Sequence, residues 1–160
     1  MSIRRATPEE ASCLSRLACE SKAHWSYCAS QLADWKDDLA ISATSIAGEP
    51  TFVIEEGGQV VGFYQLGREP RGGAEGLQLE HLWIKPAAMG KGHGRRLLHH
   101  ALREAAAHGH SQLRIDADPN AESFYVACGA RRVGVVAAAI AGQPNRVRPQ
   151  LVLSNLTRSS

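Results

Sequence analysis

The chain has 160 residues, of which 44% are hydrophobic and 21% charged, with 18 Lys and Arg against 16 Asp and Glu. This composition is ordinary for a folded globular protein, and a formal net charge of +2 is too small to predict a nucleic-acid-binding groove. No long apolar run is present. We therefore expect one domain over residues 1–160 that binds neither nucleic acid nor a membrane.

The cysteines and the N-terminal sequence bear on the cellular compartment. Four scattered cysteines form no C-x-x-C pair, and no signal peptide is recognisable at the N-terminus. Such cysteines are typical of small buried side chains in a reducing environment. We expect a cytoplasmic protein.

Hydrophobic periodicity and turn residues predict the elements of the first half of the chain. Thr7, Pro8 and Glu10 together have the pattern of a capped helix start. In order we expect a strand at Ile3–Ala6, a helix from Thr7 to about Glu20, one helical region from Leu32 to Ile46, and a hairpin of Thr51–Glu55 and Gln59–Leu66 around Gly57–Gly58.

The second half alternates strands and helices. In order we expect a strand at Leu77–Ile84 with a bulge between Leu79 and Leu82, a helix ending near His108 with Gly109 as its cap, a strand at Leu113–Ala117, a short helix from Asp118 to about Gly129, and strands at Val133–Ile140 and Val147–Leu153. This mixed order predicts an α/β sandwich on a largely antiparallel sheet.

A glycine-rich turn joins the strand that ends at Ile84 to the following helix. Residues 90–96 read Gly-Lys-Gly-His-Gly-Arg-Arg. The first turn of a helix has unpaired N–H groups and a positive dipole end, so phosphate oxygens bind there. Neither G-x-x-x-x-G-K-[ST] nor G-x-G-x-x-G is matched. On these residues alone, a phosphate site and a plain turn are both open.

Two segments resemble signatures of the GNAT superfamily of N-acetyltransferases. L-x-x-L-x-I-x-P followed by x-x-M-G-K-G-H-G-R-R-L-L resembles its acetyl-coenzyme A loop, and D-A-D-P-N-A-E-S-F-Y-V-A-C-G-A, from Asp116 to Ala130, resembles its second signature. The resemblance implies a bacterial-type, single-domain member whose six- or seven-stranded sheet splays at the central strand and has helices on both faces. Met89 departs from the family, which usually has Arg or Gln there.

The resemblance also implies a reaction and a cosubstrate. Acetyl would pass from acetyl-coenzyme A (acetyl-CoA) directly to a primary amine of a small molecule or peptide, in a ternary complex and without a metal. Relatives are commonly dimers, so a homodimer is consistent with it. The cofactor-binding residues that it implies are Leu82, Trp83, Ile84, Met89, Gly90, Lys91, Gly92, His93, Gly94, Arg95, Arg96, Asn120 and Phe124.

Two of these residues have a second interpretation. Asn120 lies just inside a predicted helix start, where its side chain could bond only to nearby backbone. Phe124 could pack against either the cosubstrate or the core. The sequence does not separate these alternatives.

Tyr125 and Glu80 are the predicted catalytic residues. The resemblance places Tyr125 near the thioester sulfur, where a phenol that is protonated at neutral pH can donate to the leaving thiolate. Otherwise Tyr125 packs the helix onto the sheet. Glu80 matches a position where many relatives have an acid, and it would help to deprotonate the amine. His81 has the better intrinsic pKa for a base, but adjacent strand residues face opposite sides.

An aromatic-rich segment follows the first predicted helix, in the region that walls the acceptor site in this family. We expect His24, Trp25 and Tyr27, together with His81, to contact the substrate by stacking or cation–π interaction. Core packing is the alternative for Trp25 and Tyr27. The acceptor itself is not predicted.

Three other interpretations carry less weight. The histidines of the second half lack carboxylate or thiolate partners at metal-ligand spacing. The basic cluster at residues 91–96 lacks the interleaved aromatic residues of a nucleic-acid-binding surface. The main alternative is a noncatalytic acyl-CoA-binding sensor that keeps the cofactor loop.

Overall fold

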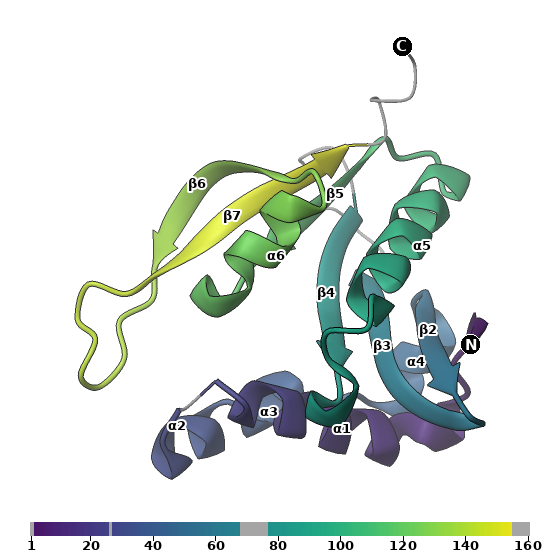
Figure 1. Ribbon diagram of the computed structural model, residues 1–160, viewed down its shortest axis with the longest axis horizontal. Coiled ribbons are helices and arrows are strands. Elements are labelled where there is room, and N and C mark those ends of the chain that lie inside the picture. Colours follow the sequence, from purple (N-terminus) through teal and green to yellow (C-terminus); the bar gives the residue numbers. More distant parts are fainter. Residues whose placement is uncertain (1, 26, 68–76, 155–160) are drawn as a thin grey trace. The chain divides into compact units, whose positions relative to one another are not determined.

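The structure is a computed structural model that describes residues 2–25, 27–67 and 77–154 (Figure 1). Seven strands form a mixed sheet in the order β1-β2-β3-β4-β5-β7-β6. The strands are β1 (Ser2–Arg5), β2 (Thr51–Glu56), β3 (Gln59–Gly67), β4 (Leu77–Ile84), β5 (Gln112–Asp116), β6 (Arg131–Ala137) and β7 (Val147–Ser154). The α-helices are α1 (Ala11–Ala23), α2 (Ala29–Asp34), α3 (Lys36–Leu39), α4 (Ala43–Gly48), α5 (His93–Ala107) and α6 (Glu122–Ala127).

The residues group into two compact units. The first unit holds residues 1–66 and 81–99, and the second holds 67–80 and 100–160. Strand β4 and helix α5 therefore each contribute to both units. The expected α/β architecture with a six- or seven-stranded sheet is confirmed, with seven strands, and antiparallel pairs lie on either side of the parallel pair β4–β5.

In the first unit, the predicted helix start at Thr7 is confirmed. Thr7 is extended and forms a capping box with Glu10, and a 3₁₀ turn at Pro8–Glu10 leads into α1. Leu14 and Leu17 of α1 are fully buried in one hydrophobic core with Phe63 of β3. The hydrophobic stripe of α1 therefore fixes this helix on the sheet of the first unit.

The expected single helix over Leu32–Ile46 is wrong, because the chain there forms three short helices, α2, α3 and α4. The backbone becomes extended at Ala40, and Ser15 Oγ of α1 accepts from Ile41 N at 2.8 Å. Ser42 then caps α4 by accepting from Ser45 N at 3.0 Å. These tertiary and capping bonds satisfy backbone groups that a continuous helix would have paired internally.

The hairpin of β2 and β3 has the expected turn. Gly57 and Gly58 both have positive φ, at 60° and 80°, as a tight hairpin turn between twisted strands requires. The hairpin ends β2 at Glu56, and this places a carboxylate at the tip of the sheet of the first unit.

In the second unit, β4 pairs with β5 in parallel register at Leu77–Leu79 against Leu113–Ile115. β5 pairs with β7, and β7 pairs with β6, both antiparallel. The C-terminal end of α5 belongs to this unit and ends as expected at Gly109. Gly109 has φ 87° and donates to Ala106 O, while His110 N donates to Ala105 O, which is a Schellman motif.

Candidate active site

The glycine turn, residues 90–96, is built by backbone conformation. Gly90 and Gly92 have φ angles of 81° and 86°, which residues other than glycine rarely adopt. Arg96 N donates to Gly92 O at 3.1 Å, so the helical bonding of α5 begins at Gly92. The N–H groups of residues 93–95 then have no acceptor within the helix and are oriented along its axis, as anion binding requires.

Two cationic or basic side chains at this turn meet the hairpin tip of the same unit. Glu56 Oε1 lies 3.5 Å from Lys91 Nζ and 3.4 Å from His93 Nε2. Burial alone would raise the pKa of Glu56, but the charge of Lys91 and the contact with His93 lower it. The contact from His93 is too poorly aligned to count as a hydrogen bond, and the ring is 1% exposed with both nitrogens unsatisfied among the described residues.

The remaining residues predicted to hold the cosubstrate are placed as follows. Leu82, Trp83, Ile84 and Met89 are half-buried in the first unit, Arg95 and Arg96 are exposed on the first turn of α5, and Asn120 and Phe124 belong to the second unit. The end of β4 lies close against β3, because a Cβ on Gly62 would lie 2.5 Å from Ile84 Cδ1 and 3.0 Å from Trp83 O.

His81 lies in an aromatic setting on β4. Its Nδ1 accepts a 3.0 Å hydrogen bond from Trp83 Nε1, and its ring lies beside Phe63. Burial lowers the pKa of His81 to about 4, so the imidazole is neutral at physiological pH. A neutral ring with Nδ1 already bonded is a weak base, but Nε2 can still contact a substrate.

The predicted acceptor wall is a set of aromatic contacts after α1. His24 and Trp25 meet edge to face at 5.0 Å, and Trp25 is 37% exposed, so Trp25 is not a core residue. Tyr27 meets Trp35 edge to face at 4.7 Å. The nearly buried Lys22 ammonium lies 5.0 Å from the Tyr27 ring and 4.3 Å from the Trp35 ring. The wall therefore already holds one cation by cation–π contact.

Glu80 lies on β4 and is partly buried. It is the last β4 residue that belongs to the second unit, because β4 from His81 onward belongs to the first. A Cβ on Gly67 would lie 2.5 Å from Glu80 Oε2 and 3.2 Å from its Cγ. The absence of a side chain at Gly67 therefore makes room for the Glu80 carboxylate. Any larger residue at position 67 would force Glu80 into another rotamer.

Tyr125 is 7% exposed on α6 and packs edge to face against Phe124, with ring centroids 5.1 Å apart. Burial, with smaller contributions from Cys128 and Asp118, raises the pKa of Tyr125 well above its ordinary value of about 10. The phenol therefore keeps its proton throughout the physiological range.

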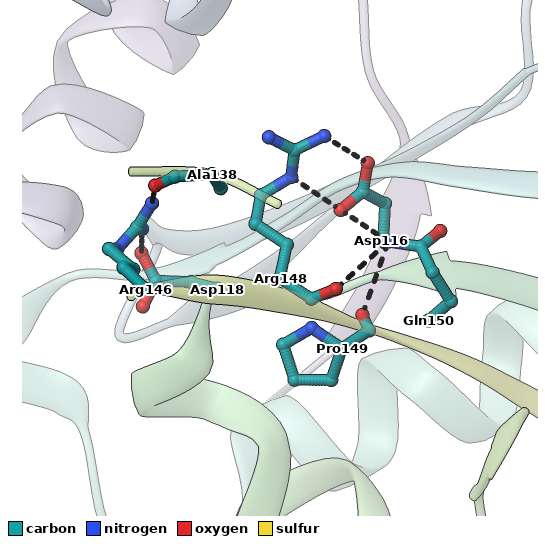
Figure 2. Close-up of polar contacts among 7 residues, drawn as sticks. All are labelled: Asp116, Asp118, Ala138, Arg146, Arg148, Pro149 and Gln150. Carbon is teal, nitrogen blue, oxygen red and sulfur yellow. Dashed lines mark hydrogen bonds and ion pairs between the residues drawn. The ribbon is translucent and has the colours of Figure 1, made fainter. Parts of the chain in front are cut away.

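Asn120 lies in the turn that begins α6. Asp118 Oδ1 accepts from Asn120 N at 2.8 Å and from Asn120 Nδ2 at 3.0 Å, so the side chain of Asn120 has the local partner that the sequence allowed. Asp118 Oδ2 lies 3.6 Å from Arg146 Nη2, and the side chains of this pair are only 10% and 6% exposed. Arg146 Nη1 also donates to Ala138 O at 3.0 Å (Figure 2).

A second acid–arginine pair lies two residues away in the sequence, with Asp116 at the end of β5 and Arg148 in β7 (Figure 2). Arg148 donates from Nε and Nη2 to the two oxygens of Asp116, at 2.8 and 3.1 Å. Gln150 Nε2 donates to Asp116 Oδ1 at 3.0 Å. We call Asp116, Asp118, Arg146, Arg148 and Gln150 the β5–β7 polar cluster.

Comparison with known proteins decides the family. The family described as "Acetyltransferase (GNAT) family" matches residues 14–130. The chain belongs to the GNAT acetyltransferase family. No curated protein matches the chain significantly.

Solved GNAT structures share the fold. A GCN5-related N-acetyltransferase from Rhodopseudomonas palustris is 23% identical, with a TM-score of 0.77 over 96% of this chain and 94% of that one. The PaiA N-acetyltransferase from Thermoplasma acidophilum, in complex with coenzyme A, is 19% identical, with a TM-score of 0.72 over 96% and 98%. YncA from Salmonella typhimurium, with its cofactor acetyl-CoA, is 22% identical, with a TM-score of 0.71 over 96% and 93%.

Two absences concern only residues 2–25, 27–67 and 77–154. There, no three His, Cys, Asp or Glu side chains gather to form a metal-binding group. Within the same ranges, no helix has the length and apolar character needed to cross a bilayer.

The sequence did not point to several polar contacts near the predicted site residues. Glu56 reaches the glycine turn from a hairpin 35 residues earlier, and Arg146 reaches Asp118 from the β6–β7 connection. No local pattern marks such contacts. The one available signal was the helix-capping position of Asp118, which shows that its carboxylate is committed to the turn.

Proposed function

We propose that this GNAT-family chain transfers an acetyl group from acetyl-CoA to a primary amine by direct attack in a ternary complex. The observation that carries the proposal is the glycine turn, where positive-φ glycines and the start of α5 present N–H groups to an anion. Lys91, Arg95 and Arg96 add positive charge at the same place. Relatives solved with coenzyme A and with acetyl-CoA support the choice of cosubstrate.

Backbone amides of Leu82, Trp83, Ile84 and the glycine turn hold the cosubstrate, with Met89 lining the approach. Asn120 can turn its amide from Asp118 toward the pantetheine arm, and Phe124 packs beside it. We propose that the reaction needs no metal.

The proposed chemistry moves two protons. The amine nitrogen forms a bond to the acetyl carbon while the carbon–sulfur bond breaks. Glu80 accepts the proton that the amine loses, directly or through water, and Tyr125 donates its proton to the sulfur. We assign the base to Glu80 because the low pKa of His81 makes that ring a poor proton acceptor. His81 instead contacts the acceptor, together with His24, Trp25 and Tyr27.

Tyr125→Phe tests the acid role. Loss of a positioned general acid should lower kcat by about 100-fold, while the KM for acetyl-CoA changes little. Release of free thiol, measured over a panel of primary amines, provides the assay. Tyr64→Phe is the matched control, because Tyr64 is a fully buried tyrosine on β3 outside the proposed site. Unchanged turnover in Tyr125→Phe would remove this residue from the mechanism.

The same assay separates the enzyme from a sensor. A protein that binds acetyl-CoA but acetylates no amine would be an acyl-CoA-binding sensor instead. A cytoplasmic location and a homodimer are also proposed, and fractionation and size-exclusion chromatography test them.

A further inference from the structure

One buried guanidinium nitrogen in the second unit has no hydrogen-bond partner among the described residues. Arg114, at the centre of β5, is partly buried, and its Nε is fully buried without a hydrogen-bond partner among the described residues. A guanidinium has five N–H donors and cannot lose its charge to avoid this cost. A buried unpaired donor in a native structure calls for an explanation, and an absent ligand is one.

The strand register places Gln78 beside Arg114. Gln78 of β4 is the parallel partner of Arg114, and Val152 is its antiparallel partner on β7. Paired residues of neighbouring strands lie on the same face of a sheet. Gln78 is only 9% exposed. Gln78, which is nearly buried, and Arg114, which is partly buried, therefore place two hydrogen-bonding side chains next to each other on one face.

The acidic residue nearest along the strand does not neutralise Arg114. Asp116 lies two residues further on the same face, but both of its oxygens accept from Arg148 and one also accepts from Gln150 (Figure 2). The Asp116 carboxylate is therefore already paired with Arg148. Among the described residues, Arg114 Nε is left without a hydrogen-bond partner.

We propose that Arg114 and Gln78 form a subsite for a carboxylate group of the acceptor. This inference rests on the proposed function, because it uses Glu80 as the base. Glu80 lies two residues after Gln78, on the same face by strand alternation and about 7 Å along the strand. A small molecule can span that distance with its amine at Glu80 and its carboxylate at Arg114. The acceptor class is therefore a small amino acid or an amine that carries a carboxylate.

The choice of a carboxylate follows from the geometry of the two side chains. A guanidinium binds a carboxylate through two parallel hydrogen bonds, and a neighbouring amide N–H₂ can complete the set. The commitment is to a carboxylate rather than a phosphate, and the experiment distinguishes the two.

The decisive experiment does not depend on turnover. The full chain, labelled with ¹⁵N, is titrated with N-acetylglycine, and the Nε–H signal of Arg114 is followed by NMR after assignment with Arg114→Lys. We expect this signal to shift and saturate, while the Arg148 signal stays in place because Asp116 already holds it. N-acetylglycinamide, which lacks the carboxylate, should cause no shift.

Three results would overturn the proposal. They are no shift with N-acetylglycine, an equal shift with the amide, and a stronger response to inorganic phosphate than to the carboxylate. Because this readout needs no acetyl transfer, the subsite can fail while the enzyme reaction stands, and the reverse also holds.

Kinetics give a second test. With acetyl-CoA saturating, glycine and β-alanine should be acetylated in preference to glycinamide and β-alaninamide. Arg114→Gln should raise the KM for the carboxylate substrates at least 10-fold and leave the KM for acetyl-CoA unchanged. Arg148→Gln is the matched control on the same face and should keep the preference. Loss of the preference in both variants, or in neither, would contradict a specific role for Arg114.

Discussion

The glycine turn and the β5–β7 polar cluster are two polar regions that the chain builds in opposite ways. The turn consists of seven consecutive residues whose backbone conformation makes the site. The cluster joins side chains up to 34 residues apart, such as Asp116 and Gln150, through cross-strand hydrogen bonds. The conformation of a backbone turn depends on residues that are adjacent in the sequence. A cluster of side chains from different strands forms only when those strands pair in the correct register.

The largest expected effect is a difference in stability between variants of the two acid–arginine pairs of the cluster. Arg146→Gln leaves Asp118 nearly buried without its cation and should cost about 3 kcal/mol of unfolding free energy. Arg148→Gln breaks a pair whose side chains are 42% and 34% exposed and should cost under about 1 kcal/mol. Urea denaturation of both variants measures the difference. Equal losses would mean that burial does not distinguish the pairs.

The next largest expected effect is a pH dependence of stability caused by His81, which lies in the same unit as the glycine turn. The pKa of His81 is about 4 in the folded chain, against 6.5 for a free histidine. Between these values the unfolded chain binds a proton that the folded chain does not. Stability should therefore fall by about 1 to 3 kcal/mol as the pH drops from 6.5 to 4, with no contribution from this group above 6.5.

Thermal melts of wild type and His81→Gln at several pH values measure this slope. The variant should lose less stability in acid than the wild type does. Parallel curves for the two proteins would show that His81 is not the buried neutral group.

Gly92→Ala should have the smallest effect on stability of the substitutions considered, but it should clearly weaken acetyl-CoA binding. Alanine at φ 86° should cost about 1 kcal/mol, although a Cβ there would meet only Arg96 Nη1 at 3.9 Å. Because the turn makes the binding site, affinity for acetyl-CoA should fall about 10-fold. Gly48→Ala, at an ordinary φ with open space, is the control and should bind acetyl-CoA as wild type does. Unchanged binding in Gly92→Ala would argue against a backbone-made site.

The same contrast explains what the sequence could predict. The capping box at Thr7, the hairpin turn at Gly57–Gly58 and the helix end at Gly109 were all predicted correctly, because each depends on a few adjacent residues. The break between α3 and α4 was not, because it depends on Ser15 Oγ of a distant helix bonding to Ile41. Local propensity had no information about that contact.

For the site, the glycine turn and its neighbouring helix were placed correctly along the chain. The Arg146–Asp118 contact could not be anticipated, nor could an Arg114 Nε without a hydrogen-bond partner among the described residues, since each depends on which strands pair and in which register. The roles of Tyr125 and Glu80 stay predictions for the experiments above.

The most direct test of the account is thermal unfolding of the purified protein with acetyl-CoA, beside ATP and NAD. At about 100 times its Kd, a ligand of the folded state adds about 2.7 kcal/mol, which raises the Tm of a domain of this size by several degrees. We expect such a shift with acetyl-CoA and a much smaller one with ATP or NAD. No shift with acetyl-CoA, or equal shifts with all three, would contradict the proposed cosubstrate site at the glycine turn.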